Sequence, residues 1–563
     1  MRTTVLATAG GLIGLLAIAL SVCAAPQLEV EVGLSGRFVA EHFTPVRILA
    51  SGIEAPFSGA FVLSQRVGTA WRGEAESRIR VDYPILGNGG YDLLLPIYDA
   101  TGPLSVTLRD EDDTVVASTE VDLREGKQNA PFRVIVGDRG ALPGGVPAVA
   151  VDDLPARWLA YEGVSALWIA RLPRPLAESQ WEAISRWVLA GGTLVLFSGS
   201  DFYLLDSPAL RDLLPITGPT VDRTTELVEG AARSGARTLL AADDGSPLLL
   251  SYPYGFGTVL LAATSAASAP QPLLEAVDAN APIAHLPSFS SASADLLEDM
   301  LLDHPDYTQA VLLVVSCLFG ASLIIAHVER PRTRVFLVLG FAALLSVSCG
   351  LVVNRANSYT DVYVFRTVLS VNRSLGIDID SYALFVPRAG TIEIPFGAGT
   401  ALLQAVPRDL HEGRFDVAIG SEGSVTLALR RGERRSLRGG GADAVPVTVH
   451  VPGDEQVEVR NELAVSLQEA VLVVDGAAYA IGTIPPGTSI HTLNQDASEE
   501  QAPSPATGLQ EVLAAARTLE PLQHGTWLVA GSITERRDRD EVQQKVRVAT
   551  LVVVEVVRDA QAI

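Results

Sequence analysis

The sequence predicts a multidomain α/β plus β protein attached to a membrane. We expect an N-terminal β-sandwich, a doubly wound α/β domain, a two-helix transmembrane hairpin and a C-terminal β-sandwich region. Two long runs without charged side chains lie close together near the middle of the chain. Short alternating runs on either side are typical of antiparallel strands. Uninterrupted apolar runs between residues 131 and 270 are typical of strands buried on both faces of a parallel sheet.

The first 25 residues have the pattern of a secretory signal. A lone Arg2 precedes an apolar core from Val5 to Val22, and small residues follow. A small-x-small rule places cleavage near Ala25. Lipidation at Cys23 and retention of the segment as an uncleaved anchor remain alternatives. In each case the residues that follow are expected outside the cytoplasm.

Residues 26–125 carry seven short alternating runs separated by turn residues, from LEVEVGL to TVVASTEVDL. Such a pattern predicts an antiparallel sandwich of immunoglobulin-like type. We interpret this region as a spacer or protein-contact module. Its aromatic residues, such as Trp71 and Tyr91, are expected in its core rather than on a sugar.

The α/β domain is predicted for residues 131–270. Its first four apolar runs are Phe132 to Val136, Pro147 to Val151, Ala166 to Ala170 and Thr193 to Phe197. A helix is expected between the last two runs, because apolar residues recur there at helical spacing and a Gly-Gly pair follows. This β-α-β unit predicts a doubly wound domain.

Several short motifs in this domain carry a family resemblance. They are Leu154-Pro155-Ala156-Arg157-Trp158, Tyr161-Glu162-Gly163, Gln180-Trp181, Trp187-Val188, Ala190-Gly191-Gly192-Thr193-Leu194-Val195 and Tyr254-Gly255-Phe256-Gly257. From Pro131 to Ala267 the chain resembles the class I glutamine amidotransferase-like domains of bacterial envelope membrane proteins. The resemblance implies a nucleophilic cysteine with a histidine and an acid. The chain has no cysteine there and no histidine between His42 and His285, so a catalytically degenerate domain is expected.

Polar residues just beyond the predicted strand ends form a candidate ligand or partner surface. Open α/β sheets place ligand sites at these ends. The candidates are Asp152, Asp153, Ser198, Ser200 and Asp201. Either serine would need a nearby general base to act as a nucleophile, and the flanking pattern is not G-x-S-x-G. Solvated loop and helix-cap carboxylates are the alternative reading of the three aspartates.

A connector at residues 271–308 leads to the two uncharged runs, Gln309 to Ala326 and Val335 to Val353. Each is close to the roughly 20 residues that cross a bilayer as a helix. The turn between them contains Arg330, Arg332 and Arg334 against one glutamate, so the positive-inside bias predicts a cytoplasmic turn. Both large flanking regions are then expected on the extracytoplasmic side of the bacterial plasma membrane.

Residues 354–563 return to β patterning and predict one or two further sandwiches. The passage from Asn461 to Leu493 is similar to hairpins in the C-terminal domains of the same envelope families. An arginine cluster stands out against the acidic chain and could meet an anionic partner, namely Arg430, Arg431, Arg434, Arg435 and Arg438. A solvated hairpin tip is the alternative, because three glycines follow the cluster.

Composition excludes several classes of function. The formal net charge is −23 over 563 residues, which should repel nucleic acid. The three cysteines are Cys23, Cys317 and Cys349, all in the apolar segments, so the outer regions have neither disulfides nor a cysteine nucleophile. The eight histidines show no zinc-binding spacing. We therefore expect no cofactor and no metal.

Three functions fit these patterns. The first is a membrane-anchored extracytoplasmic binding or scaffold protein of the cell envelope, whose partners are the membrane and other envelope proteins. The second is an accessory subunit of an ABC-type transport complex. The third is an envelope hydrolase with an unconventional site near Asp152, Ser198 and Asp201.

Overall fold

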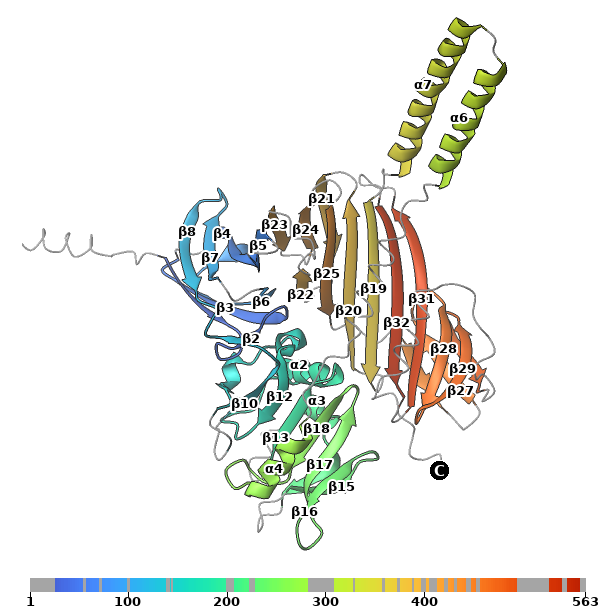
Figure 1. Cartoon of the computed structure of the whole chain (residues 1–563). Helices are drawn as coiled ribbons and strands as arrows, with labels where there is room; N and C mark the ends of the chain where they lie inside the picture. Colours follow the sequence, from blue (N-terminus) through green and yellow to red (C-terminus); the bar gives the residue numbers. More distant parts are fainter. Residues whose placement is uncertain are drawn as a thin grey trace, which may run out of the picture.

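The computed structural model describes most of the chain in segments. These are residues 26–53, 57–69, 73–98, 102–137, 142, 145–198, 207–221, 228–281, 308–327, 330–356, 360–371, 375–386, 389–395, 401–404, 413–419, 424–429, 433–441, 447–451, 456–493, 526–538 and 544–556. Strands account for 57% of the structure and helices for 17%. The protein is therefore a mostly β structure, in which three large sheets pack around two main cores (Figure 1).

The N-terminal region forms a two-sheet sandwich, and strands from the C-terminal part of the chain complete its second sheet. A three-stranded sheet, in the order β1-β3-β6, consists of β1 (Gln27–Val32), β3 (Phe43–Ser51) and β6 (Gly89–Pro96). It faces a seven-stranded sheet, here called the shared sheet. In order, its strands are β21 (Gly390–Pro395), β24 (Ser424–Leu429), β23 (Gly413–Ile419), β5 (Gly73–Leu86), β4 (Phe57–Thr69), β7 (Leu104–Asp110) and β8 (Val115–Val121).

The shared sheet joins the two ends of the chain. β5 pairs in parallel with β23, from Ala75 opposite Gly413 to Val81 opposite Ile419. The short strands β2 (Phe38–Val39) and β9 (Lys127–Gln128) form a separate parallel pair. The predicted separation into an N-terminal sandwich and a C-terminal sandwich region is therefore wrong at this point. Long-range pairing of this kind leaves no local trace in the sequence.

A mostly parallel sheet, here called the parallel sheet, occupies residues 132–262. In order, its strands are β11 (Ala148–Val149), β10 (Phe132–Val136), β12 (Val164–Ile169), β13 (Thr193–Phe197), β18 (Gly257–Ala262), β17 (Pro247–Tyr254) and β16 (Arg237–Ala241). The first five run parallel, β17 pairs antiparallel with β18, and β16 pairs antiparallel with β17. The expected apolar runs do form its strands.

The prediction of a doubly wound α/β domain is nevertheless wrong, because most connections lack a helix of normal length. Between β11 and β12 there are two 3₁₀ turns, η1 (Val151–Asp153) and η2 (Trp158–Tyr161). Between β13 and β18 lie the four-residue α3 (Pro208–Arg211) and the hairpin β14 (Ile216–Val221) and β15 (Val228–Ala232). Among the described residues of these connections, α2 (Glu178–Leu189), between β12 and β13, is the one full crossover helix.

A second β-sheet covers the face of the parallel sheet that helices were expected to cover. This central sheet has, in order, β22 (Ala401–Gln404), β25 (Glu433–Gly441), β20 (Leu375–Val386), β19 (Thr360–Val371), β32 (Gln544–Glu555), β31 (Thr526–Asp538), β28 (Leu467–Val474) and β29 (Ala477–Ile484). α2 packs between the two sheets, with Trp181, Trp187 and the central-sheet residues Phe365 and Trp527 in one core. The opposite face of the parallel sheet is covered by α4 (Gln271–Asn280).

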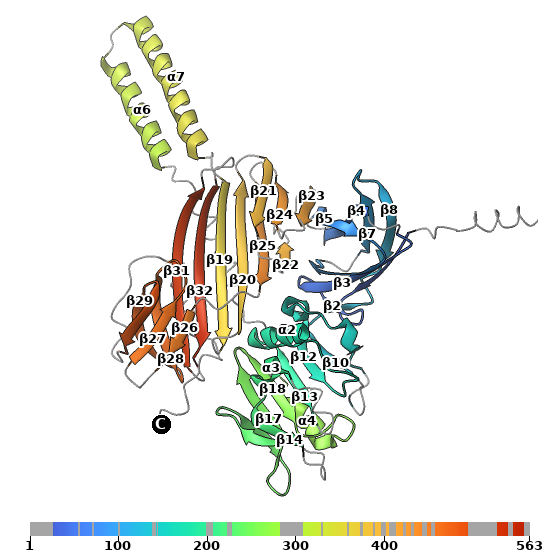
Figure 2. The same cartoon turned by 180° about the vertical axis from the view of Figure 1, so that it is seen from behind.

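The other face of the central sheet is covered at its two ends. The small sheet β26-β27-β30, with β26 (Val447–His450), β27 (Gln456–Asn461) and β30 (Gly487–Thr492), packs over one part. β21 and β24 of the shared sheet pack over another. Turning the molecule shows the small sheet at the end of the central sheet farther from α6 and α7 (Figure 2).

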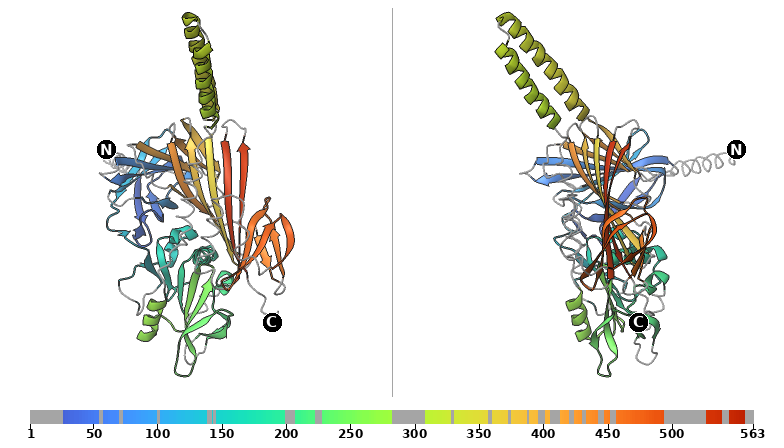
Figure 3. Two further views of the ribbon diagram at one scale, coloured as in Figure 1. Left: turned by 45° about the vertical axis from the view of Figure 1, so that its right-hand side comes forward. Right: turned by 90° about the vertical axis from the view of Figure 1, so that its right-hand side faces the viewer.

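The two predicted spans fall on α6 (Thr308–His327) and α7 (Pro331–Ala356). Within the described residues, a single stretch, Pro331–Ser348, is long and apolar enough to cross a membrane. α6 is 20 residues long and has polar residues at both ends, so its apolar part is shorter than the roughly 20 residues a span needs. The prediction of a two-helix transmembrane hairpin is therefore wrong. Both helices extend away from the central sheet and stay clear of the other elements in every view (Figure 3).

Candidate functional site

The predicted strand-end aspartates lie on η1, directly after β11, and both form ion pairs. Asp152 contacts the guanidinium of Arg174. Asp153 accepts a hydrogen bond from Arg47 of β3, and Arg47 also contacts Asp92 at 3.3 Å. Asp153 therefore attaches the parallel sheet to the N-terminal sandwich.

Ser198 follows β13 and is buried. Its hydroxyl donates to the carbonyl oxygen of Ala262 at 2.6 Å, and its backbone N–H donates to the same oxygen at 3.2 Å. These bonds fix the end of β13 to the end of β18. In this arrangement the hydroxyl proton of Ser198 is held by a backbone carbonyl oxygen rather than by the side-chain base that a serine nucleophile needs. Ser200 and Asp201 lie outside the described residues.

The arginine cluster does not form one surface. Arg430 and Arg431 lie outside the described residues, and Arg434 and Arg435 are described in their backbone alone, within β25. Arg438, farther along β25, forms an ion pair with Glu162. The three glycines after the cluster lie in β25, where Gly439, Gly440 and Gly441 pair with β20. This part of the cluster is in an interface rather than at a solvated hairpin tip.

Glu162 is the buried carboxylate to which this interface supplies bonding partners. Its side chain is 1% exposed. One carboxylate oxygen accepts from Arg438, and the other accepts from the backbone N–H of Phe43 in β3 at 3.0 Å. The carboxylate thus joins the N-terminal sandwich, the parallel sheet region and the central sheet. The sequence signal is a single glutamate within the otherwise apolar Trp158 to Ala170, which also belongs to a quoted family motif.

Trp158 strengthens the same interface. Its indole N–H donates to the carbonyl oxygen of Gly441 at 2.9 Å. A Cβ atom added at Gly440 would lie 3.0 Å from the Leu159 side chain, and one at Gly441 would lie 2.6 Å from an oxygen of Asp378. The run of glycines therefore allows β25 to approach η2 closely.

A second buried carboxylate, Glu555, lies where the turn between β17 and β18 meets the end of β32. Its oxygen accepts from the backbone N–H of Gly255 at 3.2 Å. Burial raises the pKa of this carboxyl to about 7, against the lowering effect of the Gly255 hydrogen bond. Burial, together with the nearby Asp212 and Glu555, also raises the pKa of Tyr254. Beside this contact the rings of Phe256 and Trp527 lie 5.3 Å apart.

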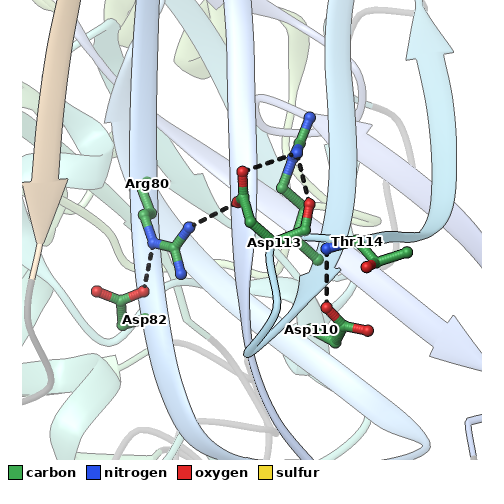
Figure 4. A network of polar contacts seen from close by, with 6 residues as sticks. Arg80, Asp82, Asp110, Asp113 and Thr114 are labelled. Atoms are coloured by element: carbon green, nitrogen blue, oxygen red, sulfur yellow. Dashed lines mark hydrogen bonds and ion pairs between the residues drawn. The ribbon is translucent and has the colours of Figure 1, made fainter.

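An arginine–aspartate network on the shared sheet is structural. Figure 4 shows Arg80 between Asp82, at 2.7 Å, and Asp113, at 3.1 Å. The backbone N–H of Thr114 donates to Asp110 at 2.8 Å, which closes the turn between β7 and β8. These side chains are a third to a half exposed, so the network stabilises a turn rather than forming an enclosed site.

One groove of about 550 Å³ lies among the described residues of the N-terminal sandwich. It follows β1 and is lined by Glu29, Val30, Glu31, Arg37, Leu49 and the segment 121–126, among others. Sequence reasoning did not identify it, because the groove depends on how two sheets end beside each other. Within the described part of the chain, no group of three or more His, Cys, Asp or Glu residues is placed to hold a metal ion.

Comparisons with known proteins add little to this geometry. No family model matches the sequence, and no curated protein matches it. A partly similar solved structure is exo-beta-1,4-mannosidase Op5Man5 from Opitutaceae bacterium strain TAV5. It is 16% identical, the match covers 24% of this chain and 31% of that enzyme, and the TM-score is 0.18. The match spans less than a third of the enzyme, and a TM-score this low carries no argument about fold or activity.

Proposed function

We propose that this protein is a membrane-anchored extracytoplasmic binding or scaffold protein of the bacterial cell envelope. The observation that carries the proposal is the use of the buried polar side chains. Glu162 and Glu555 bond one sheet region to another, and Ser198 bonds two strand ends. In an active site, such groups would converge on a cavity with a nucleophile beside a base.

Rigidity between distant segments is what a scaffold requires. Glu162 bonds to Phe43 of β3, 119 positions away in the sequence, and to Arg438 of β25, 276 positions away. Glu555 bonds to Gly255, 300 positions away. The core around α2 is continuous from the parallel sheet into the central sheet. A frame fixed at several points presents its outer surfaces in a constant arrangement, which favours binding by preorganisation.

The apolar surface of α7 supports attachment to a membrane. Phe336 is 77% exposed, Leu344 64% and Leu339 61%, and none of the stretch Pro331–Ser348 is buried in the protein. Exposed apolar surface of this extent marks a membrane or protein contact. β5, before the helices, pairs with β23, after them, so the sheets built from both halves of the chain lie on the same side of the membrane.

The alternative of a hydrolase at the strand ends is disfavoured by the bonds of Ser198 to Ala262 and by the pairing of Asp152 with Arg174. No observation favours the transport-complex subunit over other assemblies, so it becomes one outcome of the experiment below.

Topology is tested with alkaline phosphatase fusions. We expect activity for fusions after Thr217 and after Gly440, with equal amounts of fusion protein as the control, because the sheets of both halves lie on one side of the membrane. The scaffold function is tested by crosslinking in cells, detergent extraction and mass-spectrometric identification of partners. Recovery of a transport ATPase and its permease would select the transport-complex alternative. An inactive fusion at Thr217 or Gly440, or a full-length protein that crosslinks to no other protein, would contradict the proposal.

A further inference from the structure

β1 has one backbone edge that no described strand occupies. The sheet order β1-β3-β6 places β1 at the margin, paired with β3 alone. The N–H of Gly33 donates to the carbonyl oxygen of Pro45 at 2.7 Å, which fixes the alternation of hydrogen bonds along the pair. In an antiparallel ladder every second residue bonds to the partner strand. Glu29 and Glu31 therefore point their backbone groups at β3, and Leu28 and Val30 point theirs at the open side.

The open side of β1 borders the groove of about 550 Å³. The groove continues along the segment that follows β8, which is itself the last strand of the shared sheet. The two sheet margins, β1 and β8, lie close to each other beside this hollow, and no described strand is hydrogen-bonded to the open side of β1. An unpaired row of N–H and C=O groups is a template for an added strand.

Side chains of β1 divide by face. Leu28 and Val30 pack against the sandwich core, and Glu29 and Glu31 are exposed on the outer face. Among the described residues neither glutamate has an ion-pair partner. In β3, Leu49 lies opposite Glu29 and is 44% exposed. Arg47 lies opposite Glu31 and forms ion pairs with Asp92 and Asp153.

The groove as a whole is acidic. Its lining contains four carboxylates, Glu29, Glu31, Asp122 and Glu125, and two arginines, Arg37 and Arg47. Since Arg47 is paired with aspartates outside the lining, Arg37 is left to balance the carboxylates. Asp122 is paired with Arg124. The charge that remains uncompensated is negative and lies on the outer face of β1.

We propose that the open edge of β1 binds an extended segment of a partner protein, which adds to the three-stranded sheet and carries lysine or arginine at alternate positions. Its basic side chains lie opposite Glu29 and Glu31, and its apolar side chains lie on the core side beside Val30. Strand addition takes affinity from the backbone and specificity from alternate side chains, and opposite charges in facing positions stabilise the pairing. This inference rests on the binding function proposed above and names its site and partner class.

The test uses the purified full-length chain in detergent and a fluorescein-labelled peptide of eight alternating lysines and valines. Two control peptides have glutamate for lysine, or N-methyl groups on the valines, which keep the charge but block the ladder. We expect the lysine peptide to bind in a fluorescence-anisotropy titration. Each control peptide should bind about tenfold more weakly or worse.

Val30→Pro is the decisive variant, because it removes an N–H on the open side and leaves the β3 ladder intact. Val30→Ala, which loses the same packing but keeps the N–H, is its matched control. We expect about a tenfold loss of lysine-peptide affinity for Val30→Pro beyond that of Val30→Ala. The double variant Glu29→Arg and Glu31→Arg, at exposed positions, should prefer the glutamate peptide even if the proline variant fails to fold.

Equal affinity for the methylated and unmethylated peptides would show electrostatic adsorption and overturn strand addition. No peptide binding, or a dimer of the chain that Val30→Pro abolishes, would also overturn the proposed partner. The broader binding function would survive either result, because crosslinked envelope partners would still be recovered. Loss of those partners together with intact peptide binding would contradict the scaffold proposal and leave this edge site standing.

Discussion

Replacing Glu555 by glutamine should stabilise the protein at alkaline pH and not at acidic pH. The carboxyl is buried at the contact between β32 and the β17–β18 turn, and its pKa is raised from 4.5 to about 7. A raised carboxyl pKa means that the folded state binds more protons than the unfolded state between these two values. The stabilisation is therefore complete below about pH 4.5 and is lost as the pH rises through about 7.

The size of the effect follows from that shift in pKa. It corresponds to about 3 kcal/mol of the free energy of unfolding across the whole window, most of which falls between pH 5 and pH 8. Glutamine keeps an oxygen that can accept from the Gly255 N–H and does not titrate. The difference in unfolding free energy between variant and wild type should thus move in favour of the variant by about 2 to 3 kcal/mol from pH 5 to pH 8.

The measurement is denaturant unfolding of wild type and variant in the same detergent at pH 5 and pH 8. Taking the difference between the two proteins cancels the other titrating groups, and the raised pKa values of Tyr252 and Tyr254 keep both phenols neutral at pH 5 and pH 8. Glu120→Gln, at an exposed position of β8, is the matched control and should show no such change. A Glu555→Gln difference that is the same at both pH values would refute the reasoning.

Three further predictions concern buried groups. Arg438→Met should lower the free energy of unfolding by about 3–5 kcal/mol, because it leaves the Glu162 carboxylate buried without its cation. Adding Glu162→Leu should restore most of that loss, as measured in a double-mutant cycle of unfolding free energies. An additive double variant would contradict the pairing. Ser198→Ala should lower the free energy of unfolding by only about 1 kcal/mol and leave partner recovery unchanged. Wild-type Ser198 should not react with a fluorophosphonate probe. Labelling of the wild type that Ser198→Ala abolishes would favour the hydrolase function instead. Gly192→Ala should cost about 1–3 kcal/mol in unfolding free energy, because the added methyl would lie 2.3 Å from the ring of Trp187, and unchanged stability would show that the ring can move.

Local patterns predicted elements better than their assembly. The apolar runs at Phe132–Val136 and Thr193–Phe197 are strands of a parallel sheet, and α2 begins and ends close to where its periodicity indicated. The covering layer was predicted wrongly because a strand that is apolar on both faces does not specify what packs on it. In this chain a sheet some 200 positions downstream takes the place of helices, as the contact of Trp187 with the core around Phe365 illustrates.

The candidate site was limited by the same lack of long-range information. Asp152, Asp153 and Ser198 do lie at strand ends, but their partners Arg174, Arg47 and Ala262 come from other elements. A strand-end position predicts where a side chain lies and not whether another residue already uses it. Glu162 stood within an apolar stretch, which was an available signal of a buried charge, but its partner Arg438 is 276 positions away.

Glu162 and Glu555 illustrate two ways of burying a carboxylate between sheets. Glu162 has a guanidinium and a backbone N–H as partners, so its charge is compensated where it lies. Glu555 has one backbone N–H, and burial raises its pKa into the neutral range instead. The first contact therefore joins the N-terminal sandwich, η2 and β25 through a paired charge. The Glu555 carboxyl ionises as the pH rises through about 7, and its burial between the β17–β18 turn and β32 then costs the folded state free energy.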